Sequence, residues 1–176
     1  MNAEKYTQKM LDAVKTAQSM AQENGNQYLT PEHLLYALVD QDGGLIASLF
    51  GKMGVDCDGL LSELDTLIRH LPKVSGGSGE VYASPETGKI LNLAEKTAEK
   101  LHDDYISVEH LMLAIFSEGS QSVRQLLSDH GITRSRFSDE LAKVKTSPVT
   151  SDNPEDSYDA LKKYGTCLLY TSQSPR

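Results

Sequence analysis

The sequence has no tryptophan, only three phenylalanines and only two cysteines among its 176 residues. Cys57 and Cys167 stand alone, in neither a CxxC pair nor the dense cysteine pattern of small secreted scaffolds. No disulfide framework is therefore predicted. This cysteine usage is typical of a reducing compartment, and we expect a cytoplasmic location.

Basic clusters and long apolar runs are also absent. The chain carries 17 basic and 25 acidic residues, for a net charge of −8, and no run of Lys and Arg marks a nucleic-acid surface. No stretch approaches the ~20 consecutive apolar residues of a membrane helix. The first residues, MNAEKYTQKM, carry charges where a secretory signal needs an apolar run. We expect neither nucleic acid nor membrane as a partner.

The sequence also lacks a P-loop, GxxxxGK[ST], whose backbone amides would bind phosphate. Gly51-Lys52 has Ile46 at the position of the first glycine, and Gly88-Lys89 has Ala83 there. We therefore expect no ATP hydrolysis, no enzymatic activity and no cofactor in this chain. No HExxH or other metal-ligand spacing is present, and no metal is expected.

What the sequence does contain is an internal duplication. Residues 28–38 read YLTPEHLLYAL and residues 105–115 read YISVEHLMLAI, with a spacing of 77 residues. The same spacing aligns Gly54-Val55 with Gly131-Ile132. A repeat of this kind fixes the architecture before any single residue is interpreted, and two equivalent halves meet along a seam that can form a groove.

Apolar residues follow a helical period of 3.6, and sustained strand-like alternation is absent. Four positions carry residues that commonly begin helices, Ser or Thr as an N-cap and in two cases Pro after it: Thr7, Thr30 with Pro31, Ser84 with Pro85, and Ser107. We predict an all-α fold of eight helices, arranged as two tandem four-helix repeats related by a pseudo-twofold axis. The predicted boundaries are repeat 1 at 1–74, repeat 2 at 75–147 and a flexible linker at 148–165.

The double EHL motif in paired four-helix units resembles the N-terminal domain of the Clp ATPases, over roughly residues 1–147. Residues 153–165, NPEDSYDALKKYG, are similar to the segment that joins this domain to the first ATPase ring of ClpB-type disaggregases. The resemblance implies a hexameric parent that uses ATP and Mg²⁺. The following residues, 166–176, match no continuation of that family, and we assign this foreign or disordered tail no function.

Two histidines and two leucines were considered as site residues. His33 and His110 each lie one turn into a predicted helix, where the imidazole can bond locally, and we interpret both as structural. Leu11 corresponds to Gly88 in the other repeat, and Leu93 corresponds to Thr16. A position that is apolar in only one repeat need not belong to the shared core, so Leu11 and Leu93 are predicted to line a partly exposed groove.

The family resemblance adds three polar residues to the predicted substrate-binding surface: Thr7, Asp103 and Glu109. We expect them at its rim, where the carboxylates would favour cationic apolar peptides.

The sequence therefore predicts a monomeric substrate-binding module of a ClpB-type chaperone. Such a module would weakly capture apolar segments of unfolded or aggregated proteins beside the seam. Three alternatives stay open: a stand-alone adaptor or inhibitor that docks on a Clp ATPase, a ClpC- or ClpA-type domain that binds adaptors for proteolysis, and a purely architectural role.

Overall fold

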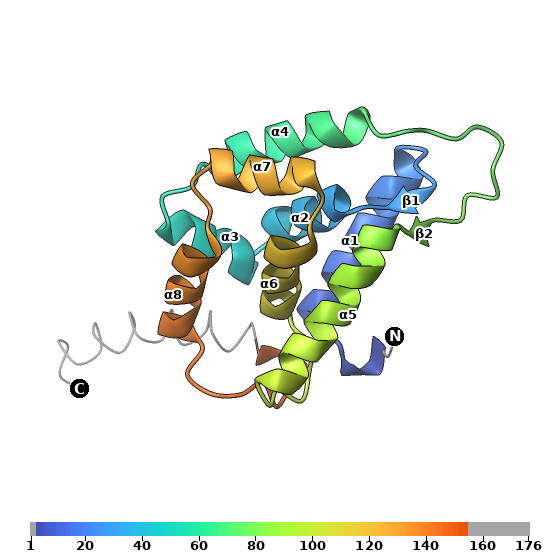
Figure 1. Cartoon of the computed structure of the whole chain (residues 1–176). Helices are drawn as coiled ribbons and strands as arrows, with labels where there is room; N and C mark the ends of the chain where they lie inside the picture. Colours follow the sequence, from blue (N-terminus) through green and yellow to red (C-terminus); the bar gives the residue numbers. More distant parts are fainter. Residues whose placement is uncertain (1–2, 155–176) are drawn as a thin grey trace, which may run out of the picture.

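The computed structural model describes residues 3–154, and Figure 1 shows their helices packed into one body. Within these residues a short 3-10 helix, η1 (Ala3–Lys5), precedes the first repeat. Repeat 1 contains α1 (Gln8–Glu23), α2 (Pro31–Asp40), α3 (Leu45–Lys52) and α4 (Cys57–Arg69). Repeat 2 contains α5 (Pro85–Lys100), α6 (Val108–Glu118), α7 (Gln121–Asp129) and α8 (Arg134–Val144).

The helix boundaries confirm the predicted all-α duplication. A shift of 77 residues places the first residues of α1, α2 and α4 on those of α5, α6 and α8, and α1 coincides with α5 along its whole length. Helix starts agree with the predicted caps. The hydroxyl oxygen of Thr7 accepts the Met10 N–H at 3.2 Å, and that of Ser84 accepts the Thr87 N–H at 3.2 Å.

Two short parallel contacts join the repeats, which the sequence did not predict. Strand β1 (Tyr28–Leu29) pairs with β2 (Tyr82–Ala83), so that Leu29 lies opposite Ala83. The equivalent bridge, 77 residues away on each side, joins Ile106 to Tyr6. The segment leading into the first helix of each repeat is therefore held by the segment leading into the second helix of the other repeat.

The two repeats share one hydrophobic core. Phe137 of α8 is fully buried and packs edge-on against Phe50 of α3, with ring centroids 6.2 Å apart. The Phe137 ring also lies 5.6 Å from that of Phe116 on α6. Helix α8 thus leans across the seam onto repeat 1, and α7 lies beside α4 (Figure 1). No helix within residues 3–154 is both long enough and apolar enough to cross a bilayer.

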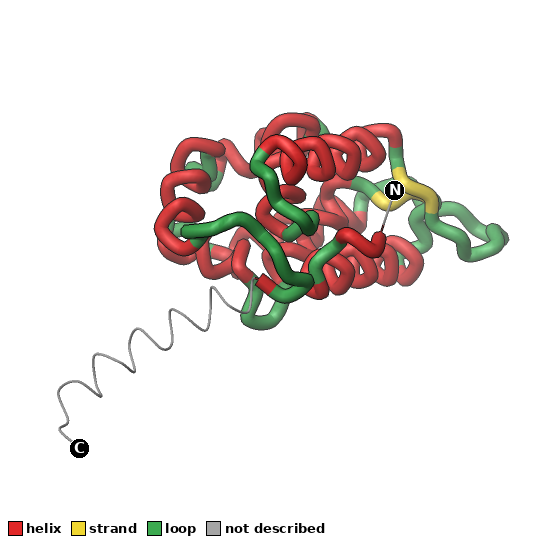
Figure 2. Tube along the Cα trace, turned by 90° about the horizontal axis from the view of Figure 1, so that it is seen from below, coloured by secondary structure: helices red, strands yellow, loops and turns green. Residues whose placement is uncertain are grey.

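The start of the predicted linker is not free but lies against the helices. Residues 145–154, here called the strap, run from the end of α8 back towards η1 and the start of α1 (Figure 2). Val149 is 1% exposed; its carbonyl accepts the Asp104 N–H at 2.7 Å. The Asp152 carbonyl accepts the Gln8 N–H at 2.7 Å. The first residues of the predicted flexible linker, Val149 and Asp152 among them, thus bond to the helical body.

The strap has a counterpart in repeat 1. Subtracting 77 from Val149 gives Pro72, whose carbonyl accepts a hydrogen bond from the Asn26 side chain at 3.0 Å. Asn26 itself corresponds to Asp103, to which Val149 is bonded. The segment that follows the fourth helix therefore packs on equivalent residues in the two repeats, and in repeat 2 this packing includes Val149, beyond the predicted boundary at residue 147. The rest of the predicted linker and the tail lie outside the described residues.

Candidate functional site

Two buried histidines cap the helices that carry the duplicated motif. His33 Nδ1 accepts the Thr30 N–H at 3.0 Å, and His110 Nδ1 accepts the Ser107 N–H at 2.9 Å. Each ring therefore carries its hydrogen on Nε2, which faces Asn26 Oδ1 at 3.0 Å and Asp103 Oδ2 at 2.7 Å, respectively. Desolvation lowers the pKa of His33 to about 4 and also lowers that of His110. These contacts agree with the structural interpretation of both residues.

Asp103 is the centre of a buried charged cluster that is specific to repeat 2. Its Oδ2 lies 2.6 Å from Lys145 Nζ, and its Oδ1 accepts the Val149 N–H at 2.7 Å. Lys145 Nζ also lies 3.1 Å from Glu109 Oε2. Burial alone would raise the pKa of Asp103, but hydrogen bonds from Lys145, Val149 and His110 outweigh it and hold the pKa low.

The equivalent site in repeat 1 contains no lysine. Asn26 replaces Asp103, and Ile68 stands where repeat 2 has Lys145. Glu32, the counterpart of Glu109, accepts hydrogen bonds at 2.7 Å from the hydroxyls of Ser120 and Ser122, which belong to repeat 2. Burial acts to raise the pKa of Glu32, whereas these hydrogen bonds lower it below its ordinary value. Among the described residues, the strap of repeat 2 is therefore held by an ion pair, whereas its counterpart in repeat 1 is held by a hydrogen bond from Asn26.

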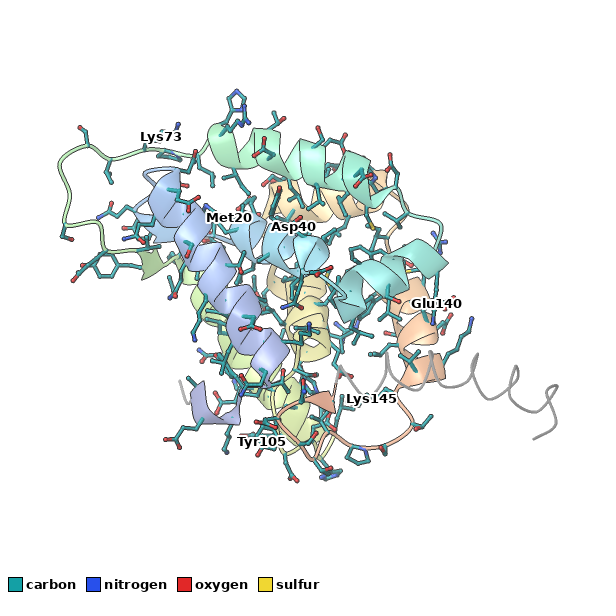
Figure 3. All side chains as sticks on the ribbon, turned by 180° about the vertical axis from the view of Figure 1, so that it is seen from behind. Met20, Asp40, Lys73, Tyr105, Glu140 and Lys145 are labelled. Carbon is teal, nitrogen blue, oxygen red and sulfur yellow. The ribbon has the colours of Figure 1, made fainter. Side chains whose placement is uncertain are left out.

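The structure does not place Thr7, Asp103 and Glu109, the residues expected at the rim of the substrate-binding surface, on the exposed surface. The side chains of all three are buried, because Thr7 caps α1 while Asp103 and Glu109 lie beneath the strap. Figure 3 labels Lys145, which closes this cluster from the lower end of α8. The carboxylates of Asp103 and Glu109 do not face solvent. That the surface above these residues binds clients stays a prediction.

Leu93, in contrast, lines an open groove of about 730 Å³ between α5, α6 and α8. Its apolar lining also includes Leu101, which is 49% exposed, and Leu113 from α6. We call this the α5–α6–α8 groove. Leu11, the other predicted leucine, is half-buried on α1 against the core and is not among the lining residues.

Part of this lining was predictable from the two repeats, because a residue that is apolar in one repeat and polar in the other need not belong to the shared core. Leu101 corresponds to Asn24, so it is apolar in one repeat and polar in the other. Leu113 corresponds to Tyr36 and gave no such signal.

A second, smaller cleft of about 400 Å³ lies on the seam itself. Leu67 of α4 and Leu126 of α7 contribute its apolar lining, between the carboxylates of Glu63 and Asp129. His130 also bonds Glu63 across the seam. The predicted contact line between repeats therefore leaves some apolar surface accessible, although the larger groove lies within repeat 2.

The fold defines a double four-helix repeat domain with cross-paired halves. The model of the family described as the Clp repeat (R) N-terminal domain matches residues 5–130, and the chain belongs to this family. The chaperone protein ClpB of Brucella suis is 39% identical over 171 residues, which make up 96% of this chain and 19% of that protein. The chain thus spans about a fifth of the curated relatives it matches.

Solved structures show the same fold. The Hsp104 N-terminal domain from Candida albicans has a TM-score of 0.76 at 17% identity, over 85% of this chain and 98% of that one. The ClpV N-domain in complex with a VipB peptide has a TM-score of 0.63 at 20% identity, over 86% of this chain and 91% of that one. The chain is accordingly a Clp N-terminal repeat domain related to ClpB, and it shares its fold with the Hsp104 N-terminal domain.

Proposed function

We propose that this domain captures exposed apolar segments of unfolded or aggregated proteins in the α5–α6–α8 groove. The observation that carries the proposal is the apolar surface that Leu93 and Leu101 give to this open groove, beside buried Leu113, on a chain related to ClpB. The ClpV N-domain, which shares the fold, forms a complex with a peptide. That precedent supports a peptide-sized ligand.

The groove is open and shallow, so a flexible segment loses conformational entropy when it binds there. We therefore expect weak capture by a single domain, with a Kd of about 10 μM or higher. In a hexameric ClpB-type parent, several tethered domains would act on one aggregate and strengthen capture ~100-fold or more. ATP and Mg²⁺ would belong to the motor of that parent, and a cytoplasmic location forms part of the same proposal.

Fluorescence anisotropy of a labelled, permanently unfolded model protein, titrated with the whole chain, tests the proposal. Leu93→Gln should weaken binding at least about fivefold while lowering the free energy of unfolding by less than ~1 kcal/mol, because Leu93 is only half-buried. Leu61→Gln is the matched control: Leu61 is a half-buried leucine on α4, away from the groove. No binding by the wild-type chain, or equal losses in both variants, would contradict the proposal.

Leu11→Gln decides how far the client surface extends. Weakened binding would place Leu11 on that surface, as the sequence predicts. Unchanged binding would confine capture to α5, α6 and α8.

A further inference from the structure

The α5–α6–α8 groove is rimmed by positive charge on a chain of net charge −8. Lys96 and Lys100 on α5 and Arg134 on α8 all line the groove, and all three are exposed. Glu99 is the single carboxylate among the lining residues. Arg134 is held in place by hydrogen bonds to the Ser117 hydroxyl at 2.8 Å and to the Leu113 carbonyl at 3.4 Å.

The equivalent face of repeat 1 lacks this positive charge. The counterparts of the three cations are Ser19, Glu23 and Cys57, as the 77-residue shift shows. Two further counterparts, Met20 for Thr97 and Asp40 for Ser117, are labelled in Figure 3 on the face that α1 and α2 present there. Both repeats have the same fold, but only the face of repeat 2 carries these three cations. The fold of the repeat therefore does not require the positive rim.

Helix electrostatics do not account for the rim. Lysines near the end of α5 complement the helix dipole, but the last turn of α1 contains no basic residue and forms a helix of equal length. Arg134 is the first residue of α8, where a positive charge opposes the dipole. Arg134 bonds Ser117 and Leu113 within the fold, and a ligand that carries negative charge would account for the two exposed lysines beside it.

We propose that the groove selects client segments in which apolar residues are flanked by Asp or Glu. The inference rests on the proposed function, and it names the class of client. Apolar side chains of the segment cover Leu93, Leu101 and Leu113, while its carboxylates lie within reach of Lys96, Lys100 and Arg134. Exposed charges act over a Debye length of about 8–10 Å, so the selection weakens as salt rises.

The test uses two labelled peptides that share one leucine-rich centre and differ only in their flanks, acidic in one and basic in the other. At low salt the wild-type chain should bind the acidic-flanked peptide about fivefold more tightly, as two exposed charge pairs allow. In the double variant Lys96→Glu/Lys100→Glu the preference should reverse. The control is Lys15→Glu/Lys52→Glu, which makes the same charge change at exposed positions outside the groove lining and should keep the wild-type preference.

Each outcome separates this inference from the proposed function. Equal binding of the two peptides, or tighter binding of the basic one, overturns the charge selection but leaves apolar capture standing. Binding of neither peptide, nor of the unfolded model protein, overturns both. Self-association of the wild-type chain that Lys96→Glu/Lys100→Glu abolishes would mean that a second, acidic copy fills the groove, and would also overturn the inference.

Discussion

Lys145 Nζ lies 2.6 Å from Asp103 Oδ2, and this contact joins the chain leaving the last helix to the loop before α6. The Asp103 side chain is fully buried and that of Lys145 is 14% exposed, so water screens the pair poorly. Removal of Lys145 would leave the carboxylates of Asp103 and Glu109 buried without their cation, whereas removal of Asp103 would leave Lys145 with Glu109 alone.

Lys145→Ile should therefore lower the free energy of unfolding by about 2–4 kcal/mol. Urea denaturation measures this change. Lys143→Ile is the control, because Lys143 forms an exposed pair with Glu140 on the same helix and should change stability by less than about 0.5 kcal/mol. Equal effects of the two substitutions would show that the buried cluster does not hold the strap.

The double variant Asp103→Asn/Lys145→Ile reproduces the Asn26 and Ile68 arrangement of repeat 1. Its loss of stability should be smaller than the sum of the two single losses by at least about 1 kcal/mol, because the charges disappear as a pair. Recovery should be incomplete, since Glu109 loses Lys145 as well. Strictly additive losses in the urea experiment would argue against coupling between the two residues.

Acid should destabilise the domain before its carboxylates titrate. The pKa of His33 is lowered from 6.5 to about 4 in the folded chain, so unfolded chains take up the proton first as pH falls. The stability that neutral His33 contributes is complete above pH 6.5 and is lost between about pH 6.5 and 4, up to about 3 kcal/mol. The lowered pKa values of Glu32 and Asp103 act in a lower pH range, near and below those of free carboxyl groups.

Glutamine at the third helical position can form a capping box without titrating. His33→Gln should therefore unfold in urea with a shallower dependence of stability on pH between 6.5 and 4.5 than the wild-type chain. His110 should supply the slope that is left, because its pKa is lowered too. A pH dependence identical to wild type would show that His33 is not the titrating group.

Leu111→Ala in the duplicated motif should cost about 2–5 kcal/mol as a cavity substitution, because Leu111 is fully buried. Leu101→Ala should cost less than about 1 kcal/mol, because half of its surface is already exposed. Thermal or urea unfolding of both variants gives the comparison. Near-wild-type stability of Leu111→Ala would remove Leu111 from the core.

His102 has φ of 60°, a left-handed conformation that its counterpart Gly25 adopts at 74°. A side chain at such a position costs roughly 1–2 kcal/mol relative to a right-handed one. His102→Gly should therefore raise the free energy of unfolding by up to about 1 kcal/mol, after allowance for the greater freedom of glycine in the unfolded chain. A lower melting temperature in this variant would indicate that the imidazole makes a stabilising contact.

The sequence predicted the helices and their duplication because both depend on local signals. Caps such as Thr7 and Ser84, and the apolar period, act within a few residues of each helix start. The pairing of Leu29 with Ala83 was not predictable, because two-residue strands are too short to show alternation.

The site was harder to predict because burial depends on distant parts of the chain. Asp103 is covered by Lys145 and Val149, more than forty residues away, within a segment whose polar composition is typical of a linker. Leu93 could be identified by comparison of the two repeats. The cations of the groove could not be identified in this way, because a lysine on a helix surface ordinarily has no partner and so gives no sign of a binding site.

The strap determines how the domain would respond to mechanical tension. A pull applied at residue 154 acts first on the bonds from Gln8 to Asp152 and between Val149 and Asp103, and only then on the helices. These bonds lie at the start of α1 and in the loop before α6. The strap can therefore detach while α5 and α8, which line the groove, remain packed. The strap would then extend before the helices that line the groove unfold.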